Sequence, residues 1–328
     1  MKYRILGKTN FKISEVSLGT WQVGGKWGTS FDDKNAEEII NKAIENGINF
    51  IDTADVYSNG LSEKAVARVV KNSGKRIYIA TKCGRRLNPH TNEAYTVEAL
   101  RNFVNDSLKN MNVDTIDLIQ LHCPPTQVYY RPEIFELFDK LKQEGKILNL
   151  GVSVEKVEEA LKAIEYPNVT TVQIIFNMFR QRPAELFFKE AQKKNVGIIV
   201  RVPLASGLLS GKFTKDTEFT KGDHRKSNRN GEWFDKGETF SGVDYEKGLQ
   251  AVEELKKIFP ADIPLSVWAI KWILMFKEVS TVIPGASRVE QVETNVMASD
   301  IRPLKSIEMK KVKEIYEKYI KDDVHQRW

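Results

Sequence analysis

Short apolar, β-branched runs alternate with amphipathic stretches from one end of the chain to the other. The apolar runs predict strands at 15–18, 48–53, 77–82, 116–122, 147–152, 171–176, 197–202 and 280–283. The amphipathic stretches predict helices at 34–46, 61–72, 97–111, 132–144, 154–164, 183–194, 264–277 and within 288–298. Regular alternation of strand and helix is typical of a parallel sheet. Eight strands with eight helices therefore predict an α/β protein with a (β/α)8, or TIM, barrel.

Three segments fall outside this repeat. Residues 2–14 predict an N-terminal hairpin that turns at 7–10 and closes the barrel floor. Residues 213–244 are polar and glycine-rich with few apolar anchors, which favours a long lid loop that does not order itself by burial. Residues 306–321 predict an extra C-terminal helix. No linker is visible, so we expect one domain over 1–328.

Composition narrows the classes of protein. Apolar residues make up 41% of the chain, which is enough for a core, and no apolar run is long enough to span a bilayer. The N-terminus does not resemble a signal peptide, and two cysteines give no disulfide framework, so we expect a cytoplasmic protein. We also expect a monomer or a weak oligomer. The net charge is +6, but Lys and Glu are interleaved on helices, as in 308–314, which argues against nucleic-acid binding. A modest positive excess suits a phosphorylated cofactor.

Four chemically distinctive residues lie at or just beyond the ends of three successive strands: Asp52, Tyr57, Lys82 and His122. In a parallel barrel these ends converge on the face that carries the chemistry. A free tyrosine has a pKa near ~10, which an adjacent ammonium lowers. A carboxylate would hold that ammonium, and a histidine would orient the same substrate oxygen. Each residue alone is more often structural, but together they predict an acid for carbonyl reduction and a base for alcohol oxidation.

The chain resembles the aldo-keto reductases along nearly its whole length. The sequence at 47–57, Gly-Ile-Asn-Phe-Ile-Asp-Thr-Ala-Asp-Val-Tyr, matches the first signature of that family, followed by Gly60 and Ser62-Glu63. Further matches are Lys82 in 80–82, His122 in 121–122, Gly19-Thr20-Trp21, and 283–288 with Gln291 and Asn295. The segment 203–212 is similar to the bacterial and potassium-channel-β branch. The resemblance implies NADPH-dependent reduction of aldehydes and ketones in a TIM barrel, with Tyr57 as general acid.

The same resemblance implies where the cofactor, NADPH or NADP+, binds. The chain has no Gly-x-Gly-x-x-Gly after an early strand, so we expect no Rossmann site. Ser287 and Arg288 are expected to clamp the 2′-phosphate. Gln291 and Asn295 share one helix face and are expected to hydrogen-bond the adenine, although without the preceding motif an exposed polar helix face would be the favoured interpretation. Cofactor contacts are expected from Thr20, Trp21, Asp52, Ser153, Gln173, Arg201, Pro203, Leu204, Ser206, Leu208, Ser210, Lys212, Gly285, Ser287, Arg288, Gln291 and Asn295. We assign no metal ligand.

Three positions depart from the family pattern. Val154 stands where the family usually has Asn, Arg201 where many members have an aromatic under the nicotinamide, and Thr294 where Glu is frequent. A guanidinium can also stack, so the prediction of cofactor binding stands.

Substrate contacts are expected from Tyr57, His122, Trp21, Trp27 and Trp233. The aromatic residues among them favour an apolar or aromatic carbonyl compound.

Two further alternatives remain open. The chain is either an active reductase or a regulatory subunit that keeps the cofactor and has slow or vestigial catalysis; a barrel isomerase or lyase acting on sugar phosphates leaves the Tyr57–Lys82 pairing unexplained. Cys83 and Cys123 directly follow Lys82 and His122. They are either two small buried residues behind the site or a redox-sensitive pair at the barrel mouth.

Overall fold

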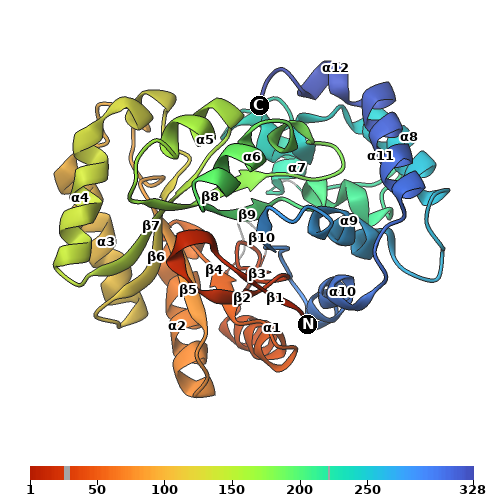
Figure 1. The fold of residues 1–328 in the computed structure, drawn as a ribbon. Helices are drawn as coiled ribbons and strands as arrows, with labels where there is room; N and C mark the ends of the chain where they lie inside the picture. Colours follow the sequence, from red (N-terminus) through yellow and green to blue (C-terminus); the bar gives the residue numbers. More distant parts are fainter. Residues whose placement is uncertain (26–29, 221) are drawn as a thin grey trace.

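Eight parallel strands form a barrel with helices packed around it, as the hydrophobic pattern predicts (Figure 1). The computed structural model describes residues 1–25, 30–220 and 222–328. The strands follow one another around the barrel in chain order: β3 (Leu18–Gly19), β4 (Phe50–Asp52), β5 (Tyr78–Cys83), β6 (Ile116–His122), β7 (Ile147–Ser153), β8 (Val169–Ile175), β9 (Gly197–Arg201) and β10 (Val279–Val282). Parallel bridges between Val16 and Val282 and between Gly19 and Gly285 join the first strand to the last. The predicted first strand, 15–18, is therefore shifted, because its pairing starts at Val16 and its regular part is β3.

The helices that follow the strands overlap the predicted ranges, although the helix predicted at 183–194 begins only at Phe187, after a 3-10 turn at Arg182–Ala184. They are α1 (Asp33–Glu45), α2 (Leu61–Ser73), α3 (Val97–Met111), α4 (Pro132–Gln143), α5 (Val157–Ala163), α6 (Phe187–Lys193), α9 (Leu265–Leu274) and α10 (Val289–Asp300). In α4, a proline opens the first turn, and Ile134, Leu137, Phe138 and Leu141 are buried against the barrel. Helix α5 begins later than predicted because the amide of Val154 still bonds to the next strand, at the carbonyl of Gln173.

Helix α8 (Tyr245–Lys256) was not predicted from the sequence. Gly248 and the surrounding charges obscure its periodicity, but Gly248, Ala251, Val252 and Leu255 form a buried face at helical spacing. A Cβ atom at position 248 would lie 3.0 Å from the Leu208 side chain, so the glycine permits the helix to approach the turn that follows β9. The predicted C-terminal helix is confirmed as α11 (Ser306–Tyr319), which packs on α8 and is followed by the short α12 (Lys321–Val324).

The predicted N-terminal hairpin closes the barrel floor. Strands β1 (Tyr3–Ile5) and β2 (Lys12–Ser14) pair antiparallel around a turn at Gly7–Thr9. Leu6 and Ile13 form an apolar cluster with residues inside the barrel, including Phe50 at the start of β4. Because the hairpin fills the end of the barrel where the strands begin, the opposite end is left for chemistry.

In the ranges that the structure describes, no helix combines the length and apolarity needed to cross a lipid bilayer.

The hairpin plug generates a stability prediction. Ile13 is fully buried, whereas Ile5 in the same hairpin is 53% exposed. We expect Ile13→Ala to lower the free energy of unfolding by about 2–5 kcal/mol, because it removes buried methyl groups and leaves a cavity. We expect Ile5→Ala to change it by less than about 0.5 kcal/mol. Urea denaturation of both variants measures the difference, and equal small effects would contradict the plug.

Candidate active site

The four residues that the sequence singles out converge at the carboxyl ends of the strands. Lys82, near the end of β5, is buried and forms an ion pair with Asp52 at the end of β4. Its ammonium also donates to the carbonyl oxygen of Thr53 at 2.8 Å and to the hydroxyl of Tyr57 at 3.3 Å. The imidazole of His122, at the end of β6, lies edge-to-face with the Tyr57 ring, 6.0 Å between centroids. One phenol therefore contacts an ammonium and faces an imidazole.

Two side-chain amides hold the Asp52 carboxylate in place. Its Oδ2 accepts hydrogen bonds from Gln120 Nε2 at 3.0 Å and from Gln173 Nε2 at 2.8 Å. Gln120 was missed in the sequence analysis. The signal for it is a polar residue two positions before His122, at the spacing that places both side chains on the inner face of β6.

The pKa values favour a neutral phenol and a neutral imidazole. Burial raises the pKa of Tyr57 above its ordinary value, although the Lys82 ammonium acts in the opposite direction. We expected a net lowering of this pKa, and that prediction is wrong. Removing the phenolate from water destabilises it more than the Lys82 ammonium stabilises it. For Lys82, burial lowers the pKa, but the charges of Asp52 and Tyr57 and the hydrogen bonds to them together outweigh it, so the net shift is upward. Burial, then the charges of Lys82 and Arg85, hold the pKa of His122 well below its usual range.

The expected nicotinamide contacts lie directly beside Asp52. Ser153 and Gln173 are paired neighbours on β7 and β8, and both are buried. The hydroxyl of Thr20 donates to the carbonyl oxygen of Asp52 at 3.0 Å. Val154 is fully buried among apolar residues, so its side chain offers no replacement for the amide that the family usually places there.

The segment after β9 is a tight turn. Ala205, Ser206 and Gly207 have positive φ angles in succession. The Leu208 side chain is buried in the core, which leaves only its backbone for a cofactor. The other residues expected here lie on the same turn or next to it, with Pro203 buried, Leu204 and Ser210 partly buried, and Lys212 exposed.

Polar groups gather at the start of α10, where Asn295 is buried and Arg288 is exposed. The amide of Ser287 donates to Gln291 Oε1 at 2.7 Å, and Asn295 donates to the carbonyl oxygen of Gly285 at 3.4 Å. Arg288 immediately precedes the helix and is exposed, and its side chain has no hydrogen bond or ion pair with the described residues. A helix N-terminus with an arginine beside it is suited to phosphate.

The lid, residues 213–244, is more ordered by burial than we expected. Phe219 and Phe240 are buried, and the lid contains the short helix α7 (His224–Ser227). The ring of His224 lies 4.9 Å from that of Trp21, so the lid reaches the first barrel loop. The expectation of too few apolar anchors is therefore wrong, because these aromatics are spaced irregularly in sequence yet meet in space. Trp233 is 52% exposed, and Trp27 lies outside the described residues.

Four charged side chains lie beside the tyrosine and histidine, and sequence reasoning singled out only one of them. Arg201 at the end of β9 forms ion pairs with Glu155 at 2.9 Å and with Glu238 of the lid at 3.4 Å. Arg85, two residues past β5, lies 3.3 Å from Glu238. Cys123, Glu155 and Glu238 offer ligand atoms within 4.8 Å of one another, but both carboxyl groups already pair with guanidinium groups, which disfavours a metal ion.

The two cysteines are free and buried. Burial raises the pKa of Cys83 well above its ordinary value and also raises that of Cys123. Since the thiolate is the reactive form, these environments favour the interpretation of two buried structural residues over that of a redox pair.

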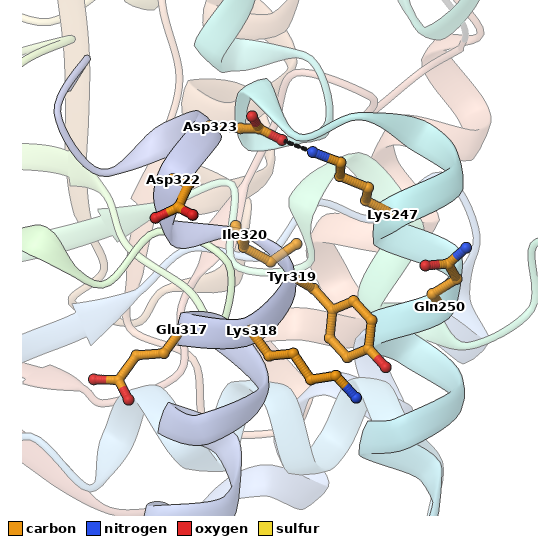
Figure 2. A pocket seen from close by; sticks show the side chains of 8 residues that line it. All are labelled: Lys247, Gln250, Glu317, Lys318, Tyr319, Ile320, Asp322 and Asp323. Atoms are coloured by element: carbon orange, nitrogen blue, oxygen red, sulfur yellow. Dashed lines mark hydrogen bonds and ion pairs between the residues drawn. The ribbon is translucent and has the colours of Figure 1, made fainter.

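A surface hollow lies between α8 and the junction of α11 and α12 (Figure 2). Lys247 of α8 points toward Asp323 of α12 and forms an ion pair with it across the rim. None of the residues that line this hollow belongs to the site at the barrel mouth.

Asp55 is a buried carboxyl group beside the site. Neither of its oxygens has a well-formed hydrogen-bond partner among the described residues. Burial, reinforced by the charge of Glu63 and opposed by that of Arg86, raises its pKa to about 7.

Comparisons with known proteins agree with this geometry. The chain matches the sequence model of the Aldo/keto reductase family over residues 15–317. It is 31% identical to aldo-keto reductase YhdN of Bacillus subtilis, over 99% of this chain and 96% of that protein. It is 27% identical to the NADH-specific methylglyoxal reductase of Escherichia coli, over 92% and 94%. The solved holo form of aldo-keto reductase AKR11C1 from Bacillus halodurans superimposes with a TM-score of 0.76 at 28% identity, covering 96% of each chain.

The buried Asp55 generates a pH prediction. Between its ordinary pKa of 3.8 and about 7, the unfolded chain is ionised at this position while the folded chain is protonated. Folding therefore becomes less favourable as pH rises through this window, and the cost is complete above about pH 7. We expect Asp55→Asn to stabilise the protein at pH 8, by on the order of 4 kcal/mol at most, and to change little near pH 4.

Urea midpoints of wild type and variant across this range test the prediction. Asp139→Asn, on the exposed face of α4, is the matched control and should show no pH-dependent gain. A constant difference between wild type and Asp55→Asn at every pH would contradict the assignment.

Proposed function

Because the chain belongs to the aldo/keto reductase family, we propose that it reduces aldehydes and ketones with NADPH and that Tyr57 supplies the proton. The observation that carries this proposal is the position of the Lys82 ammonium, which is paired with Asp52 and lies 3.3 Å from the Tyr57 hydroxyl. An ammonium fixed in this way stabilises the phenolate that forms when the proton leaves.

The residues act on one oxygen atom of the substrate. The neutral phenol of Tyr57 donates a hydrogen bond, and then its proton, to the carbonyl oxygen. His122, held neutral by burial and by the neighbouring cations, donates an N–H to the same oxygen and orients it. Its Nδ1 is buried and has no hydrogen-bond partner in the described residues. In the reverse direction the phenolate, kept beside Lys82, is the base for alcohol oxidation.

When bound, the cofactor supplies the hydride to the carbonyl carbon. We propose that Ser153 and Gln173 hold its carboxamide, and that the turn after β9 lines its pyrophosphate. Arg288 and the start of α10 would hold a 2′-phosphate, which the exposed and unpaired state of this arginine in the described chain supports. One relative is named as NADH-specific, so the preference for NADPH is a point for experiment.

Replacing the proposed acid tests the chemistry. We expect Tyr57→Phe to lower turnover of 4-nitrobenzaldehyde by roughly 100-fold or more, because general acid catalysis usually contributes this much. The dissociation constant of NADPH should hardly change, since the phenol is needed for proton transfer. Absorbance of NADPH measures turnover, and fluorescence titration measures binding.

Tyr319→Phe, at the end of α11, is the matched control and should keep wild-type turnover. Wild-type turnover in Tyr57→Phe would show that another group delivers the proton. Tight cofactor binding with no turnover in the wild type itself would instead favour the regulatory alternative.

The cofactor preference depends on Arg288. We expect Arg288→Ala to weaken NADPH binding by about 1.5–3 kcal/mol, or roughly 10- to 150-fold, because a charge-assisted contact to phosphate is lost. Binding of NADH, which has no 2′-phosphate, should change far less.

Arg101→Ala removes an equal charge from a surface pair with Glu144 and serves as the control. Equal losses of NADPH and NADH affinity in Arg288→Ala would place this side chain elsewhere on the cofactor.

A further inference from the structure

Four charged side chains from different parts of the chain are gathered at the barrel mouth. Arg85 and Glu155 each lie two residues past a strand, and Arg201 ends β9. Glu238 comes from the lid, in the short 3-10 segment Lys236–Glu238. The side chains of Arg201 and Glu155 are only 10% and 11% exposed, so their charges are largely removed from water.

The contacts within this cluster are not equivalent. Arg201 Nη2 makes a short contact with Glu155 at 2.9 Å and also donates to the carbonyl oxygen of Val154 at 3.1 Å. The Glu238 carboxylate makes two longer contacts, at 3.3 Å to Arg85 and 3.4 Å to Arg201. Three of the four residues are fixed to the barrel rim, whereas Glu238 is brought by the lid. A lid carboxylate therefore sits between two rim guanidinium groups.

The cluster adjoins the site of chemistry. Arg201 Nη2 lies 3.5 Å from the sulfur of Cys123, the residue that follows His122. The charges of Arg85 and Arg201 both lower the pKa of His122, and the charge of Glu238 contributes to raising that of Tyr57. An anion held by the two arginines would therefore lie close to a carbonyl group held by Tyr57 and His122.

We propose that Arg85 and Arg201 form a carboxylate-binding subsite, occupied by the lid residue Glu238 until a carbonyl substrate that carries its own carboxylate displaces it. This inference rests on the proposed reductase function and names its substrate class. A planar guanidinium recognises a carboxylate through paired hydrogen bonds, so one carboxylate can replace another without leaving either arginine buried and unpaired. A neutral substrate offers no such replacement, and displacing Glu238 for it would cost the pairing of two buried charges.

The charge balance favours an anion over a cation here. Burial, with the nearby Glu238, raises the pKa of Glu155 well above its usual range, whereas that of Glu238 is lowered to about 2. Burial acts against this lowering, but the charge of Arg201 and the contact with Glu155 outweigh it. Of the two carboxyl groups, that of Glu238 is therefore the more readily ionised, and it is the one that both guanidinium groups share.

The lid backbone around Glu238 is anchored independently of its side chain. Ser206 Oγ donates to the carbonyl oxygen of Glu238 at 3.1 Å, and Arg180 donates to that of Gly237 at 3.0 Å. Rotation of the Glu238 side chain can thus open the subsite while these backbone contacts persist.

The experiment compares two aldehydes of the same size, 4-carboxybenzaldehyde and 4-methylbenzaldehyde. We expect kcat/KM of the wild type to be at least about 10-fold higher for the carboxylate, since charge-assisted pairs of this kind are the strong ones. Arg85→Met should reduce this ratio by about 10-fold or more, and Arg101→Met on the surface should leave it unchanged. Glu238→Gln should lower KM for 4-carboxybenzaldehyde, because the competing carboxylate is gone.

Circular dichroism and thermal unfolding establish that each variant is folded. A wild type that reduces both aldehydes equally well overturns the subsite and leaves the proposed function intact. If neither aldehyde is reduced, the proposed function fails, and calorimetric binding of 4-carboxybenzyl alcohol to wild type and Arg85→Met decides the subsite on its own. Equal binding to both proteins overturns the subsite.

Discussion

The buried ammonium of Lys82 is the constraint on which the rest of the site depends. Lys82 and Asp52 are 1% and 2% exposed, so neither charge is solvated, and each requires partners from the protein. The carbonyl of Thr53 and the hydroxyl of Tyr57 complete the environment of the lysine, and two glutamine amides complete that of the aspartate. These partners come from the segment after β4 and from strands β6 and β8, so the ion pair is satisfied only when these parts of the barrel are assembled.

The two ends of the barrel consequently differ in the residues that they bury. At the floor, the hairpin packs Leu6 and Ile13 against apolar strand residues, and this end contributes stability. At the mouth, charged and polar groups are buried next to one another, and some of them, such as His122 Nδ1 and Asp55, lack partners in the described chain. Unpaired buried groups cost stability, and their concentration at one end is the usual mark of a site shaped for chemistry.

The lid brings one charged side chain, Glu238, to the barrel mouth. Its buried aromatics and its contacts to Arg180 and Ser206 fix its backbone, while Glu238 extends to the rim arginines. The contacts that order the lid backbone are therefore different from those that pair the Glu238 carboxylate. The backbone can stay ordered while Glu238 exchanges one ionic contact for another.

Strand periodicity and strand ends are local properties, so the amino-acid pattern predicts the barrel, the floor hairpin, the C-terminal helix and the convergence of Asp52, Tyr57, Lys82 and His122. It did not reveal α8, whose buried face includes a glycine that only close packing against Leu208 explains. The direction of the Tyr57 pKa shift also could not be predicted from the sequence. Burial and the Lys82 charge shift this pKa in opposite directions, and the net result depends on how far the folded chain excludes solvent. Only the tertiary structure brought Glu238 to Arg85, 153 residues earlier in the chain, because a contact between a loop and a strand end leaves no periodic signal in sequence.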